Sequence, residues 1–172
     1  MNHQLKKLTF MAMFIALSIV GAYIKVPSPT GTIAFDSMPA YLGGLLLGGT
    51  SGAVIGFVGH MITSAYAGFP LTLPVHLLIA MEMAFIVILY SWMVKKIGII
   101  AGGVIGSLLN GVASPAILAL MPGYGMGFFT AMVFPLLVGS IANVVLSIIL
   151  YKGLEKSKVI QQMDVFSDDK TL

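Results

Sequence analysis

The stretch Pro74-Val-His-Leu-Leu-Ile-Ala-Met-Glu-Met-Ala-Phe-Ile-Val-Ile-Leu-Tyr-Ser-Trp-Met-Val94 decides the fold class of this 172-residue chain. It is largely apolar, it carries a single carboxyl side chain, and Lys95 and Lys96 follow it directly. Its length matches the roughly 20 apolar residues that a helix needs to cross the hydrocarbon core of a bilayer. Proline suits the first turn of a helix, and tryptophan and lysine are common at membrane interfaces. The stretch therefore predicts a transmembrane helix.

The composition of the whole chain agrees with this interpretation. Apolar residues make up 58% of the chain and charged residues 9%, whereas a soluble domain is about one quarter charged. The net charge of +3 comes from scattered lysines without any arginine, so a nucleic-acid partner is not expected. The absence of cysteine excludes disulfides, thiolate metal sites and a cysteine nucleophile. A water-soluble globule is excluded, and the lipid bilayer is the expected surrounding.

The rest of the chain has room for five more spans. The run 38–66 would be about 43 Å long as a single helix at 1.5 Å per residue, which exceeds the thickness of a bilayer core. The glycines and hydroxyl residues at 48–52 favour a break, so two helices are expected there. The predicted fold is an all-α integral membrane protein, a bundle of six transmembrane helices, with the remaining spans at 8–24, 99–121 and 128–151.

The lysines indicate how the spans are oriented. Six spans with a cytoplasmic amino terminus place eight of the nine lysines inside and only Lys25 outside. Five spans place at best seven lysines inside and two outside. Both termini are therefore expected in the cytoplasm, with the three elaborate loops 25–36, 67–73 and 122–127 outside. Residues 1–158 are expected to form one membrane domain, and residues 159–172 a flexible cytoplasmic tail.

Glu82 and His76 are candidate binding residues in the fourth span. Glu82 lies near mid-depth, where a carboxyl group facing lipid would cost several kcal/mol, so it is expected to face the bundle interior. There it either contacts a substrate or a proton, or it is a neutral acid hydrogen-bonded to a neighbouring helix. His76 precedes it by six residues, which turns the two side chains about 120° apart. They cannot form a same-face metal pair.

Three further polar residues are candidates for a binding site. His60, in the outer half of the third span, is either a ligand contact or a packed polar link between helices. Asp36 ends the first external loop, where it either caps the second span or contacts a ligand from a lid. Asn110 lies at mid-depth in the fifth span, and its amide needs polar partners inside hydrocarbon.

The charges also constrain the ligand. The chain has no arginine, and Lys25 is the only lysine expected outside, so phosphorylated or carboxylate substrates are poorly matched. A neutral or weakly cationic molecule with hydroxyl groups and an aromatic ring fits better. Phe69, Tyr124 or Phe128 could stack on such a ring.

The sequence lacks the motifs of common enzyme classes. It has no Gly-x-Ser-x-Gly elbow, no His-Glu-x-x-His helix and no Gly-x-x-x-x-Gly-Lys-Ser/Thr phosphate loop. No enzymatic activity, catalytic residue, cofactor or metal site is therefore predicted. Uphill transport would need either ion coupling through Glu82 or energy from a separate ATPase. A scaffold protein held together by glycine-rich helix contacts is a third possibility.

Several of these features together resemble a known family. The size, the six predicted spans, the long proline-bearing first loop and Ala12-x-x-x-Ala16 in the first span resemble the substrate-binding S components of energy-coupling factor (ECF) transporters. The resemblance covers residues 8–152. It implies a multi-pass protein of the prokaryotic cell membrane that binds a small-molecule vitamin precursor and works with a transmembrane coupling protein and two cytoplasmic ATPases. In that family the alanine motif packs against the coupling protein, so Ala12 and Ala16 would form the docking face.

Short motifs point to one branch of this family. The branch assigned to α-ribazole, a nucleoside-like precursor in cobalamin salvage, is similar in Val26-Pro-Ser-Pro-Thr-Gly-Thr32, Phe35-Asp-Ser37, Gly59-His60, Ala67-Gly-Phe-Pro-Leu71 and Leu73-Pro-Val-His76. This similarity implies that Asp36, His60, His76 and Glu82 lie near the ligand. Riboflavin and thiamin-related compounds share the neutral, ring-bearing character and stay open as alternatives, whereas biotin and pantothenate fit less well.

Overall fold

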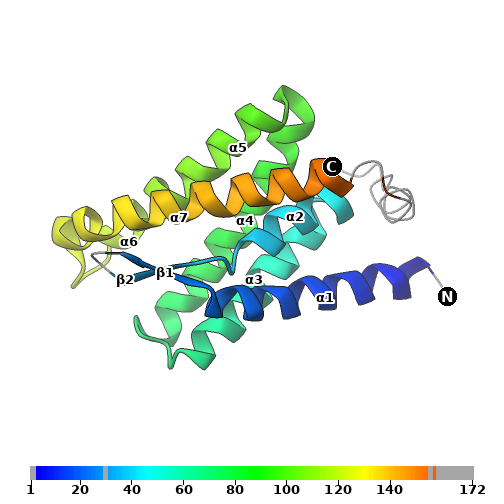
Figure 1. The fold of residues 1–172 in the computed structure, drawn as a ribbon. Helices are drawn as coiled ribbons and strands as arrows, with labels where there is room; N and C mark the ends of the chain where they lie inside the picture. The colour runs from blue at the N-terminus through cyan, green and yellow to red at the C-terminus, as the bar shows by residue number, and fades with distance from the viewer. Residues whose placement is uncertain (1–2, 29–30, 155–156, 158–172) are drawn as a thin grey trace.

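The computed structural model describes residues 3–28, 31–154 and 157 of the chain. Within this part, the protein is a helical bundle with one two-stranded hairpin (Figure 1). The hairpin strands are β1 (Lys25–Ser28) and β2 (Gly31–Ala34). The helical segments are α1 (His3–Tyr23), α2 (Met38–Leu47), α3 (Gly49–Tyr66), α4 (Leu73–Ile97), α5 (Ile99–Leu108), the π-helical turn η1 (Leu109–Ala113), α6 (Ser114–Ala119) and α7 (Gly125–Leu154). The expected tail at 159–172 lies outside the described residues.

Among the described residues, four helical stretches are long and apolar enough to cross a membrane. They are α1, α4, the continuous run α5–η1–α6, and α7. Each corresponds to a span expected from the sequence, and α4 begins with proline in its first turn as predicted. α7 begins at Gly125, three residues earlier than expected, and is 30 residues long. The start of α1 and the end of α7 lie at one end of the bundle, and the hairpin and α6 lie at the other end (Figure 1).

The two helices expected within 38–66 are present, but they are unequal. The chain breaks at Gly48, whose φ of 92° suits glycine, so the predicted break is confirmed, although residues 49–52 are already helical. α2 has only 10 residues, about 15 Å of helix, which is half of a bilayer core. The second segment is therefore a half-length helix, and the chain reaches its first residue through the β-hairpin.

The first of the elaborate loops expected outside, 25–36, contains this β-hairpin. β1 and β2 are antiparallel, with Lys25 opposite Ala34 and Ser28 opposite Gly31. Prolines exclude a helix here, and the β-branched residues of the segment favour strands. The backbone N–H of Phe35 donates to the carbonyl of Gly21 at 3.1 Å, which fixes the end of the hairpin to α1. A Cβ atom at Gly21 would lie 2.2 Å from the Phe35 oxygen, so this contact requires glycine.

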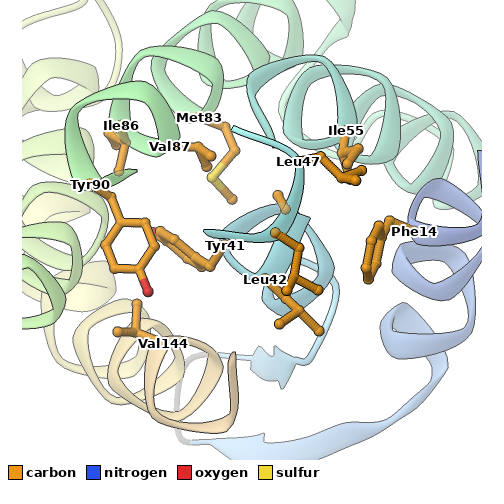
Figure 2. Close-up of a cluster of buried hydrophobic side chains, with 12 residues drawn as sticks. Phe14, Tyr41, Leu42, Leu47, Ile55, Met83, Ile86, Val87, Tyr90 and Val144 are labelled. Atoms are coloured by element: carbon orange, nitrogen blue, oxygen red, sulfur yellow. The ribbon is translucent and has the colours of Figure 1, made fainter. Parts of the chain in front are cut away.

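The buried core surrounds α2. Figure 2 shows residues of α2 facing Phe14 of α1, Ile55 of α3 and Val144 of α7. Tyr41 of α2 meets Tyr90 of α4 edge to face, with ring centroids 5.0 Å apart. Almost every residue of α2 is buried, because the helix is enclosed by protein on several sides. The position of α2 therefore depends on contacts with its neighbours rather than on lipid.

Candidate functional site

Two adjoining cavities lie between the helices. The first, called here the α1–α3 cavity, has a volume of about 380 Å³ and is lined by Ile19, Ala22, Tyr23, Ala34, Asp36, His60, Thr63, Ser64, Tyr66, Ala67, Pro70 and His76. The second, the α4–α7 cavity, has a volume of about 280 Å³ and is lined by Ala34, Asp36, Ser37, His60, Ile79, Met83, Asn110, Ser114, Met132, Pro135, Leu136, Gly139, Ser140 and Asn143. Ala34, Asp36 and His60 line both, so the cavities meet at these residues.

His60 and His76 are brought together at this junction. Nε2 of His60 lies 3.2 Å from Nδ1 of His76, although the residues come from α3 and α4. The hydroxyl of Ser64 lies 3.2 Å from the same nitrogen of His60, and the backbone N–H of Leu71 donates to Nε2 of His76 at 3.3 Å. His60 is thus a polar link between helices and also a lining residue of both cavities. In the described part of the chain, no group of three histidine or acidic side chains is placed to hold a metal ion.

Asp36 and Asn143 lie where the hairpin joins α2. The Asn143 amide accepts a hydrogen bond from the backbone N–H of Met38 at 2.7 Å and donates to the carbonyl of Ala34 at 2.9 Å. Asn143 of α7 therefore accepts a hydrogen bond from the first turn of α2, and the Ser37 side chain forms no cap there. Burial raises the pKa of the Asp36 carboxyl group, and hydrogen bonds from the backbone N–H groups of Asp36 and Ser37 partly oppose that rise.

Glu82 lies beside the α4–α7 cavity without lining it. Ser114, which does line this cavity, donates its hydroxyl to Oε2 of Glu82, whereas Oε1 is buried and has no hydrogen-bond partner among the described residues. Asn110 lines the cavity and donates to the hydroxyl of Ser140 at 3.2 Å. Asn110 lies in η1 and Ser114 directly follows it, so the π-helical turn sets the directions of both side chains.

Of the three candidate stacking residues, Phe69 and Tyr124 lie in connections between helices, and Phe128 lies in the first turn of α7. Phe69 has its ring 5.8 Å from that of His76, and the Tyr124 and Phe128 rings are 4.9 Å apart. The hydroxyl of Tyr124 donates to the carbonyl of Leu71 at 3.3 Å. None of the three is among the described residues that line the two cavities.

Other aromatic residues line the α1–α3 cavity instead. Tyr23 and Tyr66 are the last residues of α1 and α3, and their rings pack edge to face at 5.4 Å. Sequence reasoning missed this pair because each tyrosine lies at the end of a different helix. It also missed the contact between His60 and His76, whose positions are 16 residues apart.

α1 presents one exposed face outside the site. Ala12 and Ala16 are exposed on it, together with the larger side chains of Leu8, Met13 and Leu17. Phe14 and Ser18 point into the bundle and are buried. The two alanines leave a shallow strip between bulky apolar neighbours, which is a surface on which another helix can pack closely.

Comparisons with known proteins identify the family. A family described as "ECF transporter, substrate-specific component" matches residues 6–155. A solved structure described as the S component of a bacterial ECF transporter has a TM-score of 0.67 and 18% identity, covering 88% of this chain and 96% of that chain. This similarity shows a shared fold, and no curated protein matches the sequence. Because the family match spans most of the chain, the protein belongs to the substrate-specific S components of ECF transporters, which are membrane-embedded transporter subunits.

Proposed function

We propose that this S component captures a neutral vitamin precursor with an aromatic ring and hydroxyl groups, and that α-ribazole is the best candidate. The observation that carries the proposal is the pair of cavities that meet at Asp36 and His60. Their lining in the described part of the chain supplies hydroxyl, amide, imidazole and carboxyl groups, with no lysine. Such a lining suits hydroxyl groups better than it suits a phosphate.

The two cavities differ in character, which supports a ligand of two parts. The α1–α3 cavity has apolar and aromatic walls, including Ile19, Tyr23 and Tyr66, and suits a flat ring. The α4–α7 cavity contains Asn110 and Ser140 among several hydroxyl and amide side chains, and suits a sugar-like group. Together their volumes fall in the range of small-molecule sites, which is about 300–1,000 Å³. Riboflavin and thiamin-related compounds have the same two-part character and are the alternatives.

The proposed topology has six membrane-embedded segments, both termini in the cytoplasm and the hairpin on the outside. The positions of the α1 start and the α7 end at one end of the bundle support it (Figure 1). In this topology residues 1–158 form one domain, and the outer segments contribute to the cavities, since Ala34 of the hairpin lines both and Ala67 and Pro70 line the α1–α3 cavity. Phe69 and Tyr124 lie in the outer connections and Phe128 in the first turn of α7, where they can receive the ring of an arriving ligand.

Energy for uptake is proposed to come from partner proteins. A transmembrane coupling protein would dock on the strip around Ala12 and Ala16, and two cytoplasmic ATPases would drive release. A second candidate is an ion-coupled carrier, because Oε1 of Glu82 is buried without a partner among the described residues. The two differ in a simple respect, since a carrier accumulates substrate without ATPases.

Mass spectrometry of the protein purified mildly in detergent, followed by calorimetric titration, tests the proposal. α-Ribazole, riboflavin, thiamin and pantothenate are the ligands to compare. Asn110→Leu should weaken binding of the preferred ligand by about 10-fold, because it removes a polar group from the α4–α7 cavity. Ser107→Ala is the matched control, since Ser107 is buried in the same span and lines neither cavity.

The outcomes separate the candidates. A retained α-ribazole mass, or saturable binding of α-ribazole alone, supports the assignment. Binding of another vitamin would show that this vitamin, and not α-ribazole, is the ligand of the S component. Binding of none of the four would refute the ligand proposal. Uptake into liposomes by the protein alone, abolished by a proton uncoupler, would establish the carrier in place of the ATPase-driven subunit.

A further inference from the structure

We infer that His60 offers its Nδ1–H group to the ligand as a fixed hydrogen-bond donor at the junction of the two cavities, and that His76 and the backbone of Leu71 hold it in this form. The inference rests on the proposed function, because it concerns how the ligand is recognised. His60 would bind the ligand directly, and His76 would act as a positioning residue behind it.

The protonation of both rings follows from one backbone donor. The N–H of Leu71 points at Nε2 of His76, so this nitrogen accepts and carries no proton. A neutral His76 ring then has its proton on Nδ1, which lies 3.2 Å from Nε2 of His60. Nε2 of His60 must accept this hydrogen bond, and the nearby hydroxyl of Ser64 can donate to it as well. The remaining proton of the neutral His60 ring is therefore on Nδ1.

The same contacts exclude the charged forms of both rings. A doubly protonated His76 would turn an N–H group toward the N–H of Leu71. A doubly protonated His60 would turn its Nε2–H group toward the Nδ1–H group of His76. Both rings are therefore neutral, and the direction of the hydrogen bonds runs from Leu71 through His76 to His60.

The donor at the end of this series is open to the cavities. Among the described residues, Nδ1 of His60 has no hydrogen-bond partner. The described side-chain polar atoms that are fully buried without a partner are the hydroxyls of Tyr41 and Tyr90 and Oε1 of Glu82, and Nδ1 of His60 is not among them. His60 lines both cavities, so its free nitrogen faces the space in which they meet. Asp36 lines the same space and supplies acceptor oxygens.

This arrangement predicts what the ligand must present. An ether oxygen or an unprotonated ring nitrogen would accept from His60, and a neighbouring hydroxyl would donate to Asp36. A ligand with an N–H group at the first position would face a second donor and lose affinity. His60 therefore selects between closely related rings by the position of a single proton.

Nuclear magnetic resonance of the full-length protein labelled with ¹⁵N in histidine tests the first step directly. Correlation spectra distinguish a protonated from an unprotonated ring nitrogen, and the chain has only three histidines, which single His→Gln substitutions assign. The ligand-free protein should show His60 protonated at Nδ1 and unprotonated at Nε2. The opposite pattern, or a doubly protonated ring near neutral pH, would overturn the inference.

A matched pair of variants tests the effect on binding. His76→Gln retains both a donor for His60 and an acceptor for Leu71, so it should bind α-ribazole at least about threefold more tightly than the variant that loses this donor. His76→Glu, studied at mildly alkaline pH, offers only acceptors, so His60 should move its proton to Nε2 and binding should weaken at least about 10-fold. Equal losses in both variants would show a packing role, and a moved proton with unchanged affinity would show that His60 does not contact the ligand.

The failure of this inference and of the proposed function can be told apart. If the wild type binds none of the four vitamins, the ligand proposal fails, but the spectrum of the free protein still decides the protonation of His60. If α-ribazole binds tightly and leaves the Nδ1–H signal of His60 unmoved, the proposed function stands and the donor role is wrong.

Discussion

The replacement of Asn143 by leucine probes how the hairpin and α2 are held against α7. Asn143 is 2% exposed, and its amide bonds to the N–H of Met38, the carbonyl of Ala34 and the carbonyl of Gly139. Leucine has nearly the same size but no polar atom. The substitution therefore removes the hydrogen bonds without emptying the site.

The expected cost follows from the groups that lose their partner. The Met38 N–H and the Ala34 carbonyl lie on other segments, whereas the Gly139 carbonyl lies within α7 itself. An unpaired buried group costs about 1–3 kcal/mol, although hydrogen bonds measured in a membrane protein average only about 0.6 kcal/mol. Water in the adjoining α4–α7 cavity can partly replace the amide, so we expect a loss near 2 kcal/mol. For a chain of this size, that lowers Tm by about 4–8 °C.

Thermal unfolding in detergent, followed by circular dichroism, measures this loss. Ser91→Ala is the control, because Ser91 is 3% exposed but its hydroxyl donates only to the Val87 carbonyl within α4. The control should lower Tm by no more than half as much. A Tm for Asn143→Leu equal to that of the wild type, or of Ser91→Ala, would refute the reasoning that this amide joins the three segments.

Three further predictions concern docking, energy coupling and pH. Replacement of Ala12 and Ala16 by leucine fills an exposed strip that lies outside the cavities. It should therefore leave α-ribazole affinity within about twofold of the wild type and abolish ATP-dependent uptake in liposomes that contain the partner proteins. Loss of binding would show that the two alanines have a structural role. Glu82→Gln should leave ATP-dependent uptake nearly unchanged, because the amide oxygen can still accept a hydrogen bond from Ser114. If the protein were an ion-coupled carrier, the same substitution would abolish uptake. The raised pKa of Asp36 means that the folded state binds this proton more tightly than the unfolded state, so stability should fall as pH rises from about 3.8 through the raised pKa. Melting curves should show this fall in the wild type and not in Asp36→Asn.

Much of the helical framework could be predicted from the sequence, since length and hydropathy fix a transmembrane helix with little help from other segments. The break at Gly48 was predictable for a similar reason, because consecutive glycines weaken a helix locally. The hairpin was harder to predict, because its strands are short and contain proline. The half-length of α2 depends on contacts that no local pattern records, notably the hydrogen bond from Met38 to Asn143, 105 residues away.

The candidate site was predictable as a set of residue types but not as an arrangement. Asp36, His60, His76 and Asn110 do line the cavities, because polar side chains within apolar spans tend to face the protein interior. The pairing of His60 with His76 depends on how α3 packs on α4, and the sequence gives no spacing rule for that. The contact between Ser114 and Glu82 could not be predicted, because Ser114 directly follows a turn that does not keep the usual helical period.

The π-helical turn η1 suggests how proteins of this fold can diverge. A π-helical turn contains one residue more than an α-helical turn, so removal of one residue from 109–113 would restore the regular ladder. The extra residue is accommodated within the turn, so the restored helix would keep α5 and α6 nearly in register and would mainly change the directions of side chains in the turn itself, including Asn110. Insertion or deletion of a single codon can therefore change which side chain of this turn faces the cavity in one evolutionary step, without a change in membrane topology.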